Sequence, residues 1–151
     1  MIRATLKDVI NTLSGLTTEH YQLQSFGWGS LDEIEDKEVK GYMLYINPTT
    51  NSYDFTNNYS TSKLGLTLFV YTVLNENFDN RIDIISEANE ILNDILKKTN
   101  KPSFKNANGF TLSPVSSSEI MMYESTQVLF GWYINAEAEI YIGGQCLTNF
   151  E

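Results

Sequence analysis

The chain has 151 residues, a formal net charge of −9 and a single cysteine. Its length fits one domain with a full hydrophobic core, one cysteine excludes an internal disulfide, and the negative charge disfavours binding to nucleic acid or anionic membranes. No apolar run approaches the length of a membrane span, and the N-terminal stretch MIRATLKDVINTL lacks the apolar segment of a secretory signal. We therefore expect the protein to stay in the cytosol unless it leaves as part of a larger assembly.

Residues 3–19 are predicted to form the first helix, because apolar residues recur at the spacing of a helix face. This stripe contains Leu6, Val9, Ile10, Leu13 and Leu16. Thr5 can cap the helix, with Asp8 three residues later as its capping-box partner. Gly15 is expected to end the helix or to kink its last turn. A helix this short is not stable alone, so its stripe must pack on the sheet or on a neighbouring subunit.

A short strand is predicted over Tyr21–Phe26 and is expected to break at Gly27-Trp28-Gly29. An acidic run, DEIEDKEVK, follows from residue 32 to residue 40. Its carboxylates belong to Asp32, Glu33, Glu35, Asp36 and Glu38. One interpretation of this run is a solvated loop or helical turn. The other is an acidic rim or channel wall that faces something negatively charged sliding past.

Gly41–Asn47 is predicted to form a second strand, stopped by Pro48. Residues 47–63 are dominated by Asn, Ser and Thr, and three aromatic residues are spaced among them. This segment is either a linker between two hairpin strands or a projecting hairpin arm that contacts a partner. The candidate partner-contact residues of the arm are Tyr53, Phe55 and Tyr59.

Leu66–Leu74 is apolar on both faces, which is typical of a central strand, and an amphipathic helix is predicted over 79–98. Its apolar stripe contains Ile82, Ile85, Ala88, Ile91, Leu92, Ile95 and Leu96. Asp79 or Asn80 can cap the start of this helix. The basic residues of segment 97–105 are too few to predict a nucleic-acid site.

The last third of the chain is predicted to be β-structure, with strands over 110–115, from residue 120 to residue 123, and over 127–142. Alternate positions of the last strand share one apolar side, namely Ile134, Ala136, Ala138, Ile140 and Ile142. Gly131 indicates a bulge or a close approach of another backbone. The whole chain, 1–151, is thus predicted to be a single α+β domain. We expect a mixed, mainly antiparallel sheet packed against one long helix and an N-terminal helix, with a long hairpin-like arm.

The sequence offers few groups for catalysis. His20 and Cys146 are the only residues of their types; His20 is expected to be a surface or boundary residue and Cys146 an inert or buried thiol. One His and one Cys cannot form a usual tetrahedral zinc site within one chain. Glu137 and Glu139 are a pair of carboxylates that could perform acid–base chemistry, although solvated surface charge is the simpler interpretation. We expect no cofactor, no metal site and no enzymatic activity.

Three stretches resemble the tail-terminator and neck ring (head–tail connector) proteins of tailed bacteriophages, especially crAss-like and other phages of Bacteroidetes hosts. The first helix runs into YQLQSFGWGSLDEI, which is similar to the family's strand, Gly-x-Gly-x-Leu turn and acidic segment. The unit LTLFVYTVLNENFDNRIDIISEANEILNDIL resembles the family's strand and Asn-, Glu-, Ile- and Leu-rich helix. LFGWYINAEAEI resembles its Gly-Trp terminal strand. The order of the predicted elements also resembles that of the family.

This resemblance implies a structural virion protein that forms a hexameric or dodecameric ring between portal and tail parts. The implied partners are copies of itself and other neck, portal or tail proteins. DNA would pass non-specifically through the channel, and the ring would contact no membrane. It would be assembled in the host bacterial cytoplasm and remain in the virion. The candidate channel-facing residues are Asp32, Glu33, Glu35, Asp36, Glu38, Glu137 and Glu139. The alternative, from another class, is a small monomeric or dimeric α+β domain that binds a ligand in an apolar pocket.

Overall fold

The computed structural model describes residues 4–34, 39, 41–54, 61–75, 77–123 and 127–141, with the backbone alone for 31, 32, 50–54 and 141. The elements in chain order are α1 (Leu6–Glu19), β1 (Leu23–Trp28), the 3-10 helix η1 (Leu31–Ile34), β2 (Tyr42–Asp54), β3 (Thr61–Val73), α2 (Arg81–Thr99), α3 (Pro102–Asn108), β4 (Phe110–Tyr123) and β5 (Val128–Tyr141). The strands form one sheet in the order β1-β2-β3-β5-β4. β1 and β2 are parallel and the other pairs are antiparallel, which confirms the predicted α+β class.

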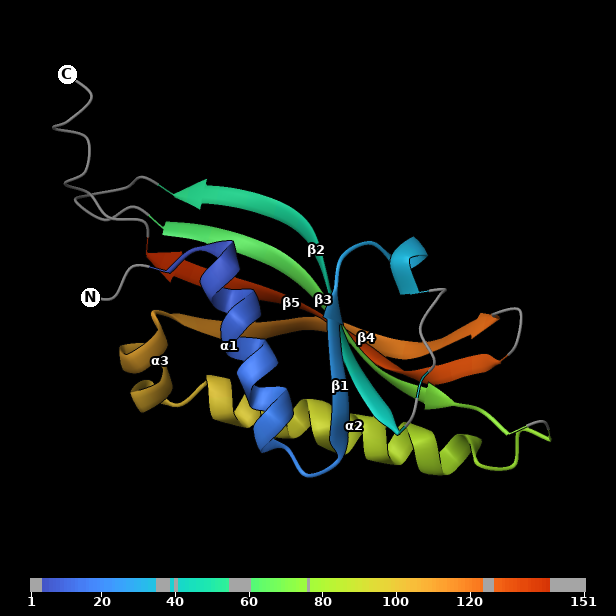
Figure 1. Ribbon diagram of the computed structural model, residues 1–151. Coiled ribbons are helices and arrows are strands. Elements are labelled where there is room, and N and C mark those ends of the chain that lie inside the picture. The colour runs from blue at the N-terminus through green and yellow to red at the C-terminus, as the bar shows by residue number, and fades with distance from the viewer. Residues whose placement is uncertain are drawn as a thin grey trace, which may run out of the picture.

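The two long helices pack on the same face of the sheet. Figure 1 shows α1 and α2 crossing one side of the strongly twisted strands, with α3 beyond the end of α2. The core between these layers combines the buried stripes of both helices with alternate residues of the strands. Its strand members include Leu44, Ile46, Leu66, Leu68, Val70, Ile134, Ala136, Ala138 and Ile140. The predicted inward face of the last strand is therefore confirmed for the residues that the structure describes.

The predicted capping box fixes the start of α1. Asp8 Oδ2 accepts a hydrogen bond from the Thr5 backbone N–H at 2.8 Å, and Thr5 Oγ1 accepts one from the Asp8 N–H at 3.3 Å. The backbone bond first, and the hydroxyl bond second, lower the pKa of the Asp8 carboxyl. Gly15 does not end the helix, since α1 continues to Glu19, the predicted last residue. A glycine inside a helix costs only about 1 kcal/mol, which burial of the following Leu16 offsets.

The buried face of α2 is rotated from the predicted one. Its buried residues are Ile84, Ala88, Ile91, Leu92, Ile95 and Thr99. Ile82, predicted to lie in the stripe, is 76% exposed because it is two residues from Ile84 and so about 200° around the helix. Asn80 is at the N-cap position but makes no capping bond with its side chain. Its Oδ1 instead accepts a hydrogen bond from the Asn75 backbone N–H at 3.0 Å.

Two predicted strand ends are wrong at the β1–β2 side of the sheet. β1 continues through the predicted break to Trp28, which pairs with Ile46. β2 continues past Pro48 to Asp54, with a bulge just after the proline. Beyond Ile46, β2 is paired only with β3 among the described residues, and an edge strand accepts a proline at a bulge because no ladder hydrogen bond is lost on the open side.

The predicted arm at 47–63 begins and ends as a β-hairpin. β2 and β3 stay paired up to Asp54 and Thr61, with residues 55–60 outside the described chain. The return strand is not isolated, because Leu64 is also paired with Ala138 of β5. The base of the hairpin is therefore an integral part of the sheet.

The second half of the chain contains one helix that was not predicted from the sequence. It also contains one continuous strand where two separate strands were predicted. α3 begins with Pro102 and is capped at its C-terminal end by Gly109, whose φ of 79° is the left-handed conformation that glycine favours. Phe104 of α3 packs edge-on against Phe110, with 5.3 Å between ring centroids. β4 is a single strand over 110–123, bent by a bulge after Pro114.

Candidate functional site

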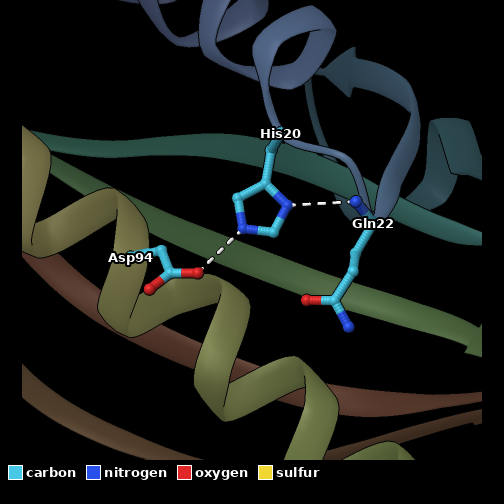
Figure 2. Close-up of polar contacts among 3 residues, drawn as sticks. All are labelled: His20, Gln22 and Asp94. Carbon is cyan, nitrogen blue, oxygen red and sulfur yellow. Dashed lines mark hydrogen bonds and ion pairs between the residues drawn. The ribbon is translucent and has the colours of Figure 1, made fainter.

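His20 joins the end of α1 to the side of α2. Its Nε2 lies 3.0 Å from Asp94 Oδ2, and its Nδ1 accepts a hydrogen bond from the Gln22 backbone N–H at 3.2 Å. Figure 2 shows the imidazole between these two partners. Because Nδ1 accepts from a backbone amide, the ring hydrogen is on Nε2 and points at the Asp94 carboxylate. The ring is much more buried than expected for a surface residue, with 12% of the side chain exposed.

The contacts of His20 have a structural role. Both ring nitrogens of His20 are engaged, so neither is free to take a proton from a substrate in this arrangement. A second contact beside it, an ion pair of Lys98 with Glu19, links the same two helices. The small cavity between them holds about 160 Å³ and is lined partly by these charged groups. The residues around His20 therefore hold α1 and α2 together.

A larger apolar groove lies between the start of α1 and the end of β1. It holds about 420 Å³ and is lined by Leu6, Lys7, Ile10, Asn11 and Trp28. The Trp28 side chain is 60% exposed, although its residue belongs to a strand. Apolar side chains that gather around an open groove are typical of a binding surface. The sequence did not reveal this groove, because the helical spacing places Leu6 in the buried stripe and the flanking glycines of Trp28 predict a break in the chain.

The first acidic candidates lie on the sheet face away from the helices. η1 contains Asp32 and Glu33, and it packs Ile34 against Tyr45 and its neighbours on that face. Glu33 reaches over Gly29, where an added Cβ would collide with its carboxylate. Burial, and secondarily the charge of Glu33, raise the pKa of the Tyr45 hydroxyl. The other candidates of this run, Glu35, Asp36 and Glu38, are outside the described residues.

Glu137 and Glu139 are exposed on the same face of the sheet, because they alternate with buried Ala136 and Ala138. They lie toward the hairpin end, with Lys63 of β3 directly across from Glu139. Tyr133, which is near η1, precedes Glu137 by four residues, or about 13 Å along the strand. The structure thus brings the two acidic groups to one face but not to one place.

Between these ends the same face is polar. Thr67 Oγ1 donates to Asn135 Oδ1 at 2.8 Å, and Asn135 Nδ2 donates to Ser116 Oγ at 2.9 Å. This chain of hydrogen bonds crosses β3, β5 and β4. The face therefore changes from apolar and covered near η1 to polar and then charged near the hairpin.

The aromatic candidates are less fully described. Tyr53 belongs to β2 and pairs with Ser62 of β3, and only its backbone is described. Phe55 and Tyr59 lie outside the described residues, as does Cys146. Their predicted partner contacts stay predictions.

In the part of the chain that the structure describes, no three His, Cys, Asp or Glu residues are grouped to bind a metal ion. Within the same part, none of the helices is both long and apolar enough to cross a membrane. No protein-family model matches the chain, and no curated protein is detectably similar to it in sequence.

Proposed function

We propose that the protein is a structural subunit of a tailed-bacteriophage virion that assembles with copies of itself into a ring. The ring would be a tail terminator or a head–tail connector in the neck, hexameric or dodecameric, with DNA passing through its channel. It acts by assembly and contact with other neck, portal or tail proteins, without catalysis. It forms in the host cytoplasm and stays in the virion.

The observation that carries this proposal is the one-sided layering of the sheet. Both long helices cover one face, and the other face exposes Glu137 and Glu139 near its hairpin end. Lys63 opposite Glu139 reduces the charge of this pair without cancelling it. A wall of carboxylates repels phosphate groups, which suits a channel that DNA must pass without binding.

The order of the elements is a second support. The chain runs through a helix, a short strand, the 3-10 helix η1, a long hairpin, a long helix, the short helix α3 and two final strands. Apart from η1 and α3, this is the order on which the resemblance to tail-terminator and neck ring proteins rests. The unpaired sides of β1, β4 and the end of β2 leave surfaces of different shape on opposite sides of the subunit, as a head-to-tail ring needs.

Electron microscopy of the purified, concentrated full chain tests the proposal directly. We expect annular particles whose inner wall is the helix-free face. Light scattering after size exclusion should give a mass of six or twelve subunits. A protein that stays monomeric at every concentration, alone and with tail or portal partners, would contradict the ring.

A matched pair of charge reversals tests the acidic wall. Glu137→Lys puts a cation on the helix-free face, and Glu90→Lys makes the same change in charge on the exposed side of α2. We expect rings of the first variant to bind duplex DNA in a salt-dependent way, and rings of the second to bind it no better than wild type. Equal binding by both variants would remove the argument for a channel on this face.

The alternative, a small ligand-binding domain, is favoured by one observation. The groove between α1 and Trp28, at about 420 Å³, is within the range of roughly 300–1,000 Å³ typical of small-molecule sites. A monomer that binds an apolar fluorescent probe in this groove, and loses it on Trp28→Ala, would favour this class of protein over the ring.

A further inference from the structure

The structure leaves a second apolar surface exposed, at the start of α2. Ile82 is 76% exposed and Phe78 44% exposed. The intervening Arg81 turns away from them, because its guanidinium stacks on Phe130 at 5.3 Å and pairs with Glu119 at 3.4 Å. Ile82 and Phe78, which we call the α2 knob, are thus left without the arginine as a cover.

The backbone holds the knob in an unusual conformation. Phe78 has a φ of 57°, the only positive value among the described residues other than glycine. Bulky side chains rarely adopt this conformation. The turn is fixed by a hydrogen bond from the Phe78 N–H to the Asn75 carbonyl at 2.9 Å and by a bond from Asn75 Nδ2 to Asp79 Oδ1 at 2.9 Å. The exposed ring is therefore held in a defined position.

The groove described above has the complementary character. Leu6, Ile10 and Trp28 give it apolar walls, and Lys7 lies on its lining. The neighbouring Asp8 carboxylate is hydrogen-bonded to the Thr5 amide and hydroxyl, and its interaction with Lys7 is one of charge at a distance. The groove thus presents an apolar hollow with a lysine beside it.

We propose that the α2 knob of one copy of this chain docks into the groove of a second copy. Asp79 and Asp83, both exposed, lie beside the knob, and their negative charge is complementary to the positive charge of Lys7 in the groove. Chains that each carry a net charge of −9 repel one another on average. A local contact of opposite charges is therefore what selects one docking register over others.

The knob and the groove are different surfaces, since the knob is on α2 and the groove is on α1 and β1. Repeated head to tail, such a contact gives a closed ring or an open filament, whereas reciprocal docking of two copies gives a two-fold dimer. The proposed ring requires the head-to-tail arrangement. The inference rests on the proposed self-assembly and adds the surfaces through which it occurs.

Cysteine cross-linking between two singly substituted proteins tests the contact. In a Cys146→Ser background, Asn11→Cys places a thiol in the groove and Ile82→Cys places one on the knob. A tag on one protein makes the mixed dimer visible by its size. We expect a disulfide-linked dimer in the mixture and far less in either protein alone.

Val115→Cys is the matched control, since Val115 is also an exposed aliphatic residue, at 66%, but lies on β4. Its mixture with Asn11→Cys should cross-link only at the background rate. The proposal is wrong if Asn11→Cys links to both partners equally. It is also wrong if Ile82→Cys links mainly to itself, which would indicate a symmetric contact.

A second measurement does not depend on thiol chemistry. Ile82→Asp should weaken self-association about tenfold or more, because it buries a charge in the apolar groove. The thermal unfolding midpoint of the protein should be nearly unchanged, because residue 82 is exposed. Val115→Asp should leave association at the wild-type level. Equal association of both variants would overturn the proposal.

The outcomes separate this contact from the function proposed above. Rings that form without the mixed cross-link would reject the knob-and-groove contact and keep the ring. A specific cross-link in open filaments alone would keep the contact and reject the ring. A monomer whose groove takes up an apolar probe or another protein instead would reject the contact.

Discussion

His20 and Asp94 are 74 residues apart in sequence, and their side chains meet at 3.0 Å. The contact ties the last turn of α1 to the middle of α2, on the face of the sheet that carries the main core. Because α1 carries the groove and α2 carries the knob, this contact helps to set the geometry between the two surfaces proposed for assembly.

Replacing His20 by alanine should destabilise the fold by about 1–3 kcal/mol, because the Gln22 amide and the Asp94 carboxylate both lose a partner. Urea unfolding measures this loss. Tyr21→Ala is the control: Tyr21 stacks on the same ring at 5.3 Å but is highly exposed, so its effect should be within about 0.5 kcal/mol. If the two variants were equally stable, the contact would have no structural role.

Two glycine-to-alanine changes should act in opposite directions. A Cβ on Gly131 would overlap the backbone carbonyl of Val70 in the neighbouring strand, so Gly131→Ala should cost about 1–3 kcal/mol or more. Gly15, in α1, has nothing within 4 Å of the added carbon, so Gly15→Ala should stabilise by about 0.5–1 kcal/mol. Thermal unfolding of both variants checks the difference in sign.

The capping box predicts a specific response to acid. Hydrogen bonds from Thr5 lower the pKa of Asp8 below 3.8, so its contribution to stability is present above that pH and is lost as the pH falls through the lower, folded-state pKa. The stability difference between wild type and Asp8→Asn should therefore shrink as the pH is lowered from 5 toward about 2. Thr5→Ala should cost about 1 kcal/mol at neutral pH. A difference that stays constant with pH would contradict the hydrogen-bonded carboxylate.

The contact of Tyr42 with Glu87 should make the stability of the fold depend on pH under alkaline conditions. Its hydroxyl donates a hydrogen bond to the Glu87 carboxylate. Burial first, and then this bond and the charge of Glu87, raise the pKa of Tyr42 well above 10.0. Its stabilising effect is therefore complete below pH 10 and declines as the pH rises toward the folded-state pKa.

The measurement is ultraviolet titration of tyrosine ionisation, with urea unfolding at each pH. Tyr42→Phe should remove one late-ionising tyrosine from the titration, which identifies Tyr42, and Glu87→Gln should lower the ionisation midpoint of that same tyrosine. Tyr42→Phe should also reduce the loss of stability above pH 10. An unchanged titration curve in Glu87→Gln would show that the carboxylate does not act on Tyr42.

The parts of the fold that depend on local periodicity could be predicted from the sequence. Most of the stripe of α1, the part of the α2 stripe from Ala88 to Ile95, the capping box and the alternation of β5 all follow from neighbours a few residues apart. The exposed Ile82 could not be assigned in this way, because α2 contains more isoleucines than one face accommodates. Only the packing of the helix on β3, β4 and β5 decides that Ile84 is inside.

Pro48 and Pro102 show a second limit. Pro48 is predicted to end a strand, and no helix is predicted to start at Pro102. Pro48 instead lies within β2, where pairing to a single neighbour makes it acceptable, and Pro102 starts α3, since the first helical position needs no N–H partner. The groove needed two elements, α1 and the end of β1, to be brought together, so no local pattern could reveal it.

The two prolines within the sheet have a consequence for how its exposed strands meet other chains. Pro48 and Pro114 each stand beside a bulge, on β2 beyond the end of β1 and on the outermost strand β4. Neither edge therefore offers an unbroken row of backbone donors to a passing chain. These two stretches therefore disfavour pairing with a strand of another chain, and the proposed self-association would depend there on contacts between side chains, which can be specific and reversible.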